Sequence, residues 1–393
     1  MNNMKKGLAV YVHIPYCARK CQYCDFVSYE NMLDTCQLYG TRICEEIAQY
    51  KTLLSDYEVQ SVFFGGGTPS FVPEEMIGNI LHTLQCQIAF SKDAEITLEC
   101  NPNSITLQKL QAYYAFGINR LSIGLQSLSD AELSILGRLH SSKQVLESLQ
   151  YAAEAGFSNI SVDLMFGIPG QTLTSLSNTI RSCAAFPIQH ISLYSLILEE
   201  GTPLYQKVQQ GIITPVSEEI DRAMYHSAVH QLKKLGFAQY EVSNFARENQ
   251  YRCRHNLTYW KLGEYIGLGC AAHSCFQNTR YCNPSSLTEY LKGTDREQAM
   301  KSGQALTYKD HLEEAVMLGL RLNEGIDLRD FQAKYSLNLL EAAASAIVPL
   351  KQAGIISIED NRLFATEKGF DLLNYIILQI SAALDEKKVE RNL

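Results

Sequence analysis

The chain has 393 residues, of which 46% are hydrophobic and 19% are charged, proportions typical of a water-soluble globular protein of two or three domains. Its formal net charge of −8 argues against nucleic acid as the main partner, because phosphate binding requires a basic surface. Twelve cysteines are too dilute for a disulfide scaffold, so we expect a reducing, cytoplasmic location. No apolar run approaches the roughly 20 residues that span a bilayer.

Apolar, strand-like segments alternate with amphipathic helical patterns through the first half of the chain. The sequence predicts strands over 8–14, 59–64, 95–100, 120–125, 158–164 and 189–196, and helices over 33–54, 73–86, 104–116, 142–156 and 171–185. Such alternation is typical of parallel strands joined by right-handed crossovers. Six strand–helix units predict an α/β fold built on a partial (β/α)6 barrel rather than a full eight-stranded one.

We expect three parts along the chain: a barrel over 1–230, a cover segment over 231–303, and a smaller C-terminal module over 304–393. The last part has helical patterns followed by a short hairpin, which resembles a winged helix. Residues 304–393 contain ten Lys and Arg against fourteen Asp and Glu. This balance argues against DNA binding and favours a packing or lid module.

Three cysteines with the spacing C-x3-C-x2-C follow the first predicted strand: Cys17, Cys21 and Cys24. Soft thiolates suit an iron–sulfur cluster or zinc. Zinc prefers four ligands, usually from paired knuckles, and the sequence contains no second C-x2-C. Three thiolates on a [4Fe–4S] cluster leave one iron open to another ligand. The remaining alternative is that these cysteines are small residues of the core.

This cysteine spacing resembles that of the radical S-adenosylmethionine (SAM) enzymes. In that family the amino and carboxylate groups of SAM chelate the open iron, and one electron from the cluster cleaves SAM. The glycines at 65–67 and Thr68 follow the second predicted strand and resemble the motif that binds the SAM amino group. The alternative is that these glycines only form a tight turn, because glycine readily adopts the positive φ angles that such turns require.

Polar residues recur where the later strands end. Glu99 closes the third strand, Gln126 follows the fourth, Arg138 comes soon after, and Asp163 lies late in the fifth. Loops after strand carboxyl ends share one face of a barrel, and that face carries the active site. The alternative for each residue taken alone is a structural role, as part of an internal salt bridge or as a cap. Together they predict one constellation of hydrogen-bonding groups.

A narrower resemblance covers nearly the whole chain, to the oxygen-independent coproporphyrinogen III oxidase group of radical SAM proteins. It includes the run from Tyr11 to Cys24, the Gly-Ile-Pro-Gly at 167–170 and the C-terminal module. The resemblance implies that the residues contacting SAM are Tyr11, Tyr23, Gly66, Gly67, Thr68, Glu99, Gln126, Arg138, Asp163 and Ile197.

The group has two branches, the oxidase HemN and the haem chaperone HemW. HemN has a fourth cysteine two residues after the third ligand, where this chain has Phe26. HemW carries His-Asn-x-x-Tyr-Trp, which is present here as His255 to Trp260. The resemblance implies haem bound by His255, Tyr259 and Trp260, with His255 on the iron; a satisfied core histidine is the alternative.

The leading prediction is therefore a haem chaperone with a [4Fe–4S] cluster and SAM, and its enzymatic activity is left open. The alternative is a coproporphyrinogen III oxidase, which would convert two propionates to vinyl groups. A non-catalytic iron–sulfur scaffold is disfavoured by the set of predicted SAM contacts. The implied partners are recipient haemoproteins, including ones at the membrane, and a flavodoxin or ferredoxin as electron donor. The sequence is compatible with a homodimer and assigns no role to Cys270, Cys275 and Cys282.

Overall fold

The computed structural model describes residues 5–391, and the contacts among them divide the chain into two units. The first unit comprises the chain up to Ala238 with Ser243–His255 and Glu264–Gln304. The second comprises Gln239–Val242, Asn256–Gly263 and the chain from Ala305. The expected division at residues 230 and 303 stays a prediction.

Six parallel strands form the centre of the first unit, and all six were predicted. Each pairs with the next in the order β1-β4-β5-β6-β7-β8. Their bounds are β1 (Lys6–Ile14), β4 (Tyr57–Gly66), β5 (Ala89–Cys100), β6 (Arg120–Gln126), β7 (Ile160–Phe166) and β8 (His190–Ser195). This order confirms the α/β fold and the partial (β/α)6 barrel, because every neighbour runs parallel and is reached by a crossover.

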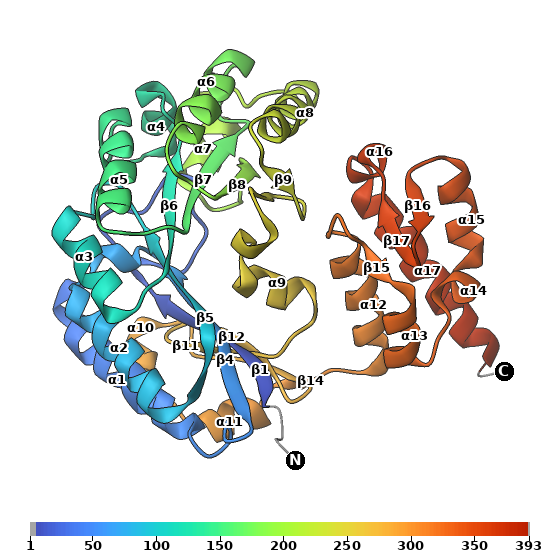
Figure 1. The fold of residues 1–393 in the computed structure, drawn as a ribbon, viewed down its shortest axis with the longest axis horizontal. Helices are drawn as coiled ribbons and strands as arrows, with labels where there is room; N and C mark the ends of the chain where they lie inside the picture. The colour runs from blue at the N-terminus through green and yellow to red at the C-terminus, as the bar shows by residue number, and fades with distance from the viewer. Residues whose placement is uncertain (1–4, 392–393) are drawn as a thin grey trace. The chain divides into compact units, whose positions relative to one another are not determined.

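Helices cover the outer face of these strands (Figure 1). The predicted crossover helices are α1 (Cys36–Tyr50), α2 (Glu74–Gln87), α3 (Leu107–Phe116), α5 (Ser142–Glu154) and α6 (Leu173–Ala184). Capping boxes start two of them, with Ser141 and Gln144 at α5 and Thr172 and Ser175 at α6; such caps satisfy the first free N–H groups of a helix. In the described part of the chain, no helix has the length and apolar character needed to cross a membrane.

Further elements complete the first unit. The helical pieces are η1 (Leu33–Thr35), η2 (Pro69–Phe71), η3 (Asn249–Tyr251), α4 (Asp130–Leu136), α7 (Pro203–Gln209), α8 (Glu218–Lys234), α10 (Leu287–Tyr290) and α11 (Arg296–Lys301). The sequence also predicts a helix over 218–235, and α8 occupies almost the same residues. The sequence does not predict α4 and α7, which have only seven residues each and so show little periodicity.

The large sheet also extends beyond the six strands. Next to β1, in parallel, lies β11 (Tyr265–Leu268), followed by the antiparallel strands β12 (His273–Phe276) and β13 (Thr279–Cys282). The other side continues through β10 (Asn244–Ala246), and the two edge strands β9 (Ala238–Gln239) and β14 (Gln304–Ala305) each span a boundary between the units. Residues of the expected cover segment thus form sheet strands.

The two faces of the central strands differ in polarity. On β5, Ile96 and Leu98 lie in the hydrophobic core, whereas Glu95, Thr97 and Glu99 point to the opposite face, as the two-residue period of a strand requires. Other central strands also place buried polar side chains in this way: Ser61, Arg120, Ser122, Ser161, His190 and Ser192. The barrel interior is therefore a polar environment able to hold charged ligands.

The second unit has its own hydrophobic core. Its elements are α12 (Tyr308–Gly319), β15 (Ile326–Asp327), α13 (Leu328–Tyr335), α14 (Leu339–Ala342), α15 (Ala344–Gln352), β16 (Ile356–Glu359), β17 (Arg362–Ala365), α16 (Glu367–Phe370) and α17 (Leu373–Arg391). The three strands form an antiparallel sheet in the order β15-β17-β16. Helices with a small hairpin match the expected winged-helix-like module. The sequence predicts one helix over 337–353, where the structure has two, α14 and α15.

Candidate functional site

The cysteine loop is closed at its base by two short strands, β2 (Tyr16–Cys17) and β3 (Tyr29–Glu30), which pair in parallel. All three thiols are free; Cys17 is buried, and Cys21 and Cys24 are partly exposed. The Arg138 guanidinium lies against this loop and donates from Nη1 to Cys21 Sγ over 3.4 Å. Burial raises the pKa of the Cys17 and Cys24 thiols, so a metal centre, which binds the thiolate form, would have to overcome this shift.

These thiols suit a cluster better than a single ion. Among the side chains that the structure describes, those of residues 5–385, no three His, Cys, Asp or Glu form a group that could hold one metal ion. A [4Fe–4S] cluster takes each thiolate on a different iron, so its ligands need not converge on one point. Three free thiols on one closed loop, with a guanidinium beside them, therefore fit the cluster that the spacing predicts.

A hydrogen-bonded chain supports the cysteine loop from inside the barrel. The Tyr11 hydroxyl lies 3.0 Å from Nδ1 of His13 on the same strand, and His13 Nε2 lies 2.8 Å from the Val27 carbonyl oxygen just after the loop. His13 is only 6% exposed. The position of the loop is therefore tied to side chains on β1.

The glycine run lies directly against the start of the cysteine loop. The Gly67 amide donates to the Ile14 carbonyl over 2.9 Å, and the Thr68 amide donates to the Tyr16 carbonyl over 2.8 Å. Gly66 has a φ of +106°, and a Cβ there would overlap the His13 imidazole. A Cβ on Gly67 would lie 2.8 Å from the Ile14 oxygen. Glycine is therefore required both by conformation and by close approach.

Two partly buried carboxyls lie at the same end of the barrel. Glu99 Oε2 accepts a hydrogen bond of 3.2 Å from the Gly66 amide, and Asp163 accepts from the Ser122 hydroxyl at 3.2 Å. Burial and the nearby Asp163 carboxylate raise the pKa of Glu99 to about 8. Burial also raises the pKa of Asp163. A cationic ligand would lower the free-energy cost of ionising these two carboxyls, because an ionised carboxyl away from water needs a partner.

The structure brings Gln126 and Arg138 together. Gln126 ends β6 with a φ of +67°, and Arg138 Nη2 donates to the Gly124 carbonyl over 2.5 Å. A Cβ on Gly124 would lie 3.1 Å from Gln126 Nε2 and 3.3 Å from Arg138 Nη2. Both side chains therefore converge on the glycine of β6, next to the cysteine loop.

Tyr23 and Ile197 occupy different surroundings. Tyr23 packs against a small apolar cluster that includes Met165 on β7 and Ile168 just after it. Ile197, in the loop after β8, is 66% exposed, as is Phe26 at 69% beyond the third cysteine. Thr68, Glu99 and Arg138 thus contact the cysteine loop or the glycine run directly, whereas Ile197 is exposed in the loop after β8.

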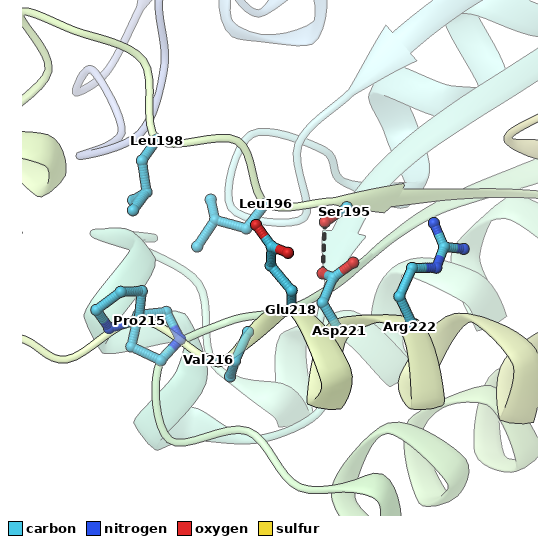
Figure 2. Close-up of a pocket in the computed structure, with 10 residues that line it drawn as sticks. Ser195, Leu196, Leu198, Pro215, Val216, Glu218, Asp221 and Arg222 are labelled. Carbon is cyan, nitrogen blue, oxygen red and sulfur yellow. Dashed lines mark hydrogen bonds between the residues drawn. The ribbon is translucent and has the colours of Figure 1, made fainter. Parts of the chain in front are cut away.

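A cavity of about 360 Å³ lies at the carboxyl ends of β7 and β8, beside Ile197. Figure 2 shows its apolar side chains, Leu196, Leu198, Pro215 and Val216, facing the acidic first turn of α8. There the Ser195 hydroxyl donates to Asp221 over 2.7 Å. Such a cavity suits a ligand with an apolar ring and hydrogen-bond donors at its edge.

His255 lies in the position of a core histidine, which the sequence analysis gave as the alternative to a haem ligand. It is on α9 (Arg254–Trp260) and 1% exposed, with Nδ1 3.1 Å from the Ser61 hydroxyl inside the barrel. Tyr259 and Trp260 are on the same helix and half-buried, but they belong to the second unit. The haem-binding role of these three residues stays a prediction.

Sequence reasoning missed Ser61, Glu95 and Arg120, which line the barrel interior together with the predicted residues. Their signal was present: Glu95, Thr97 and Glu99 alternate with apolar residues along one strand. A polar period of two inside a parallel sheet indicates a polar interior face.

The raised pKa of Glu99 predicts that stability falls as pH rises. Between the ordinary pKa of 4.5 and the folded value of about 8, the folded chain keeps a proton that the unfolded chain has lost. One such proton lowers the free energy of unfolding by about 1.4 kcal/mol per pH unit. Without SAM, Glu99→Gln should therefore gain stability relative to the native chain as pH rises, measured by urea unfolding. Glu58→Gln is the control, and a pH-independent difference for Glu99→Gln would contradict the assignment.

Comparison with known proteins gives matches over both parts of the chain. The radical SAM superfamily model matches residues 11–183, and the HemN C-terminal domain model matches residues 306–372. The solved structure of coproporphyrinogen III oxidase (HemN) from Escherichia coli has a TM-score of 0.84 and covers 96% of this chain and 90% of its own. At 22% identity, this likeness concerns the fold.

Curated relatives match over nearly the full length. The heme chaperone HemW of Bacillus subtilis is 32% identical, over 92% of this chain and 96% of the relative. The mitochondrial radical S-adenosyl methionine domain-containing protein 1 of Bos taurus is 36% identical, over 98% and 89%. The HemW of Lactococcus lactis is 30% identical, over 95% and 97%. With the parallel barrel, the cysteine loop and the C-terminal module already described, this chain belongs to the HemW family of radical SAM proteins.

Proposed function

We propose that this protein is a haem chaperone that carries a [4Fe–4S] cluster, binds SAM and haem, and delivers haem to haemoproteins in the cytoplasm or at its membrane. The observation that carries the proposal is the full-length similarity to proteins named heme chaperone, at 32% identity over 96% of the Bacillus subtilis relative. The His-Asn-x-x-Tyr-Trp motif at 255–260 and Phe26 in place of a fourth cysteine support the same branch.

In this proposal Cys17, Cys21 and Cys24 would hold the cluster, which would supply an electron to bound SAM, with a flavodoxin or ferredoxin as its reductant. Glu99 and the Gly66 backbone are placed to orient the amino group of SAM. Arg138 stabilises a thiolate of the loop and can meet the SAM carboxylate. The cavity beside Ile197 offers space for the adenine ring.

Native protein is expected to bind about one haem per chain and to convert little or no coproporphyrinogen III. A haemin titration under nitrogen, followed by the Soret band, measures binding; product analysis with reduced cluster and SAM measures conversion. His255→Ala should change the Soret band or abolish haem transfer, because a neutral imidazole is a good iron ligand. His82→Ala, an exposed histidine on α2, is the matched control.

The opposite result would favour the oxidase. SAM-dependent decarboxylation of coproporphyrinogen III by the native protein, together with the absence of saturable haem binding, would refute the chaperone proposal. Haem binding that is equal in His255→Ala and His82→Ala would leave the chaperone function in place but remove His255 as its ligand.

A further inference from the structure

The His255 imidazole is enclosed by side chains of the barrel interior. Its Nδ1 lies 3.1 Å from the Ser61 hydroxyl of β4. Its ring stacks on Phe63 of the same strand, with ring centres 5.1 Å apart and planes 27° apart, and Tyr11 of β1 lies 6.3 Å away. The residue is 1% exposed. A porphyrin cannot approach an imidazole in this position.

The backbone that carries His255 is held by a second group of contacts. Glu95 on β5 accepts hydrogen bonds of 3.2 Å from the amides of Arg254 and His255, and the Cys253 thiol lies 3.6 Å from the same carboxylate. Glu95 in turn lies 4.0 Å from the Arg120 guanidinium. These contacts involve the main chain, so the His255 side chain can change partner while the backbone stays attached to β5.

Haem ligation and the internal position are therefore mutually exclusive. We propose that His255 is a two-state residue, held by Ser61 and Phe63 in the haem-free protein and released from them to ligate haem. This inference rests on the proposed function and concerns its regulation. In the internal state the His255 imidazole is shielded from solvent. The free energy that favours this state must be overcome when haem binds, so it lowers the apparent haem affinity.

The burial of His255 keeps the imidazole in the neutral form in the internal state. Burial and the nearby Arg120 lower the pKa of His255 to about 3, so release requires no loss of a proton at physiological pH. The charged groups facing this region from the neighbouring strands are Glu95 and Arg120, with Asp93 bound to Arg254 at the exposed end. The exchange of partners is therefore a matter of hydrogen bonding and stacking rather than of charge.

Ser61→Ala tests the competition directly. Loss of one internal hydrogen bond corresponds to a factor of about five in an equilibrium constant, so the variant should bind haem about fivefold more tightly in a Soret titration. The structure offers a matched control in Ser161, whose hydroxyl lies 2.7 Å from Nδ1 of the buried His190. Ser161→Ala removes the same kind of bond from the same barrel and should leave haem affinity unchanged.

A second measurement follows His255 itself. In ¹⁵N-histidine spectra of the haem-free protein, Ser61→Ala should shift the His255 Nδ1 resonance, whereas haem bound to native protein and to Ser61→Ala should give the same His255 environment. Phe63→Leu, which removes the stacked ring but keeps the position apolar, should also tighten haem binding. Thermal unfolding of each variant confirms that the barrel remains folded.

The outcomes separate the inference from the function on which it rests. Tighter binding in Ser61→Ala, together with loss of the Soret change in His255→Ala, supports both. Unchanged or weaker binding in a folded Ser61→Ala, with His255→Ala still defective, overturns the two-state inference and leaves the chaperone function intact. If His255→Ala binds haem like the native protein, the inference fails because His255 is then not the ligand; if native protein binds no haem, the chaperone function fails as well.

Discussion

Protein purified without oxygen is expected to lose its iron and sulfide completely when Cys17, Cys21 and Cys24 are all replaced by alanine. The three thiols are on one loop between β2 and β3. A cluster that loses three thiolate ligands has no remaining attachment to the protein. Iron and acid-labile sulfide analysis, with the visible absorption band of the cluster, measures the effect.

Cysteines outside the loop provide the control. Cys86 on α2 and Cys282 on β13 are both exposed, so the double alanine variant changes the thiol content without touching the loop. It should retain the full cluster. Stoichiometric iron in the triple variant, or stoichiometric zinc in native protein, would show that the loop has been assigned the wrong metal centre.

Glu99→Gln and Asp163→Asn are each expected to weaken SAM binding by roughly 10- to 100-fold. Each change removes a partly buried carboxylate while keeping its shape, and a hydrogen bond to a charged group contributes about 1.5–3 kcal/mol. Glu99 is held by the Gly66 amide and Asp163 by Ser122, so both carboxyls are fixed before a ligand arrives. Calorimetry on cluster-loaded protein measures the change in affinity.

The variants must be compared at equal cluster content, because SAM is expected to bind the open iron as well. Glu75→Gln, an exposed acid on α2, serves as the matched control and should leave affinity unchanged. If the Glu99 and Asp163 variants both bind SAM like the native protein, the pocket lies elsewhere, whether or not the cysteine loop holds a cluster.

The central barrel could be predicted because its strands and helices have clear local periods. Ile96, Leu98 and Cys100 alternate with polar residues on β5, and the helices between strands bury one face each. The strand-end residues Glu99, Gln126 and Asp163 followed from the rule that parallel strands share a carboxyl edge. Topology and sequence spacing were sufficient for this part of the site.

Other features depend on long-range contacts that leave little trace in the local sequence. Strand β11 has only four residues, and one of them is Gly267. It becomes a strand because β1 offers a free edge. The burial of His255 depends on Ser61, which is 194 positions away. No short-range pattern distinguishes an imidazole that faces the barrel interior from one that faces solvent.

The contacts from Tyr11 through His13 to Val27 connect the two proposed binding sites, the cysteine loop for the cluster and His255 for haem. Tyr11 contacts the His255 ring at one end, and the hydrogen bond from His13 reaches the chain just beyond Cys24 at the other. Thermodynamic reciprocity then applies: whatever factor cluster loading introduces into haem affinity, haem must introduce into cluster affinity. The chain without the cluster and the chain that holds it would therefore differ in haem affinity.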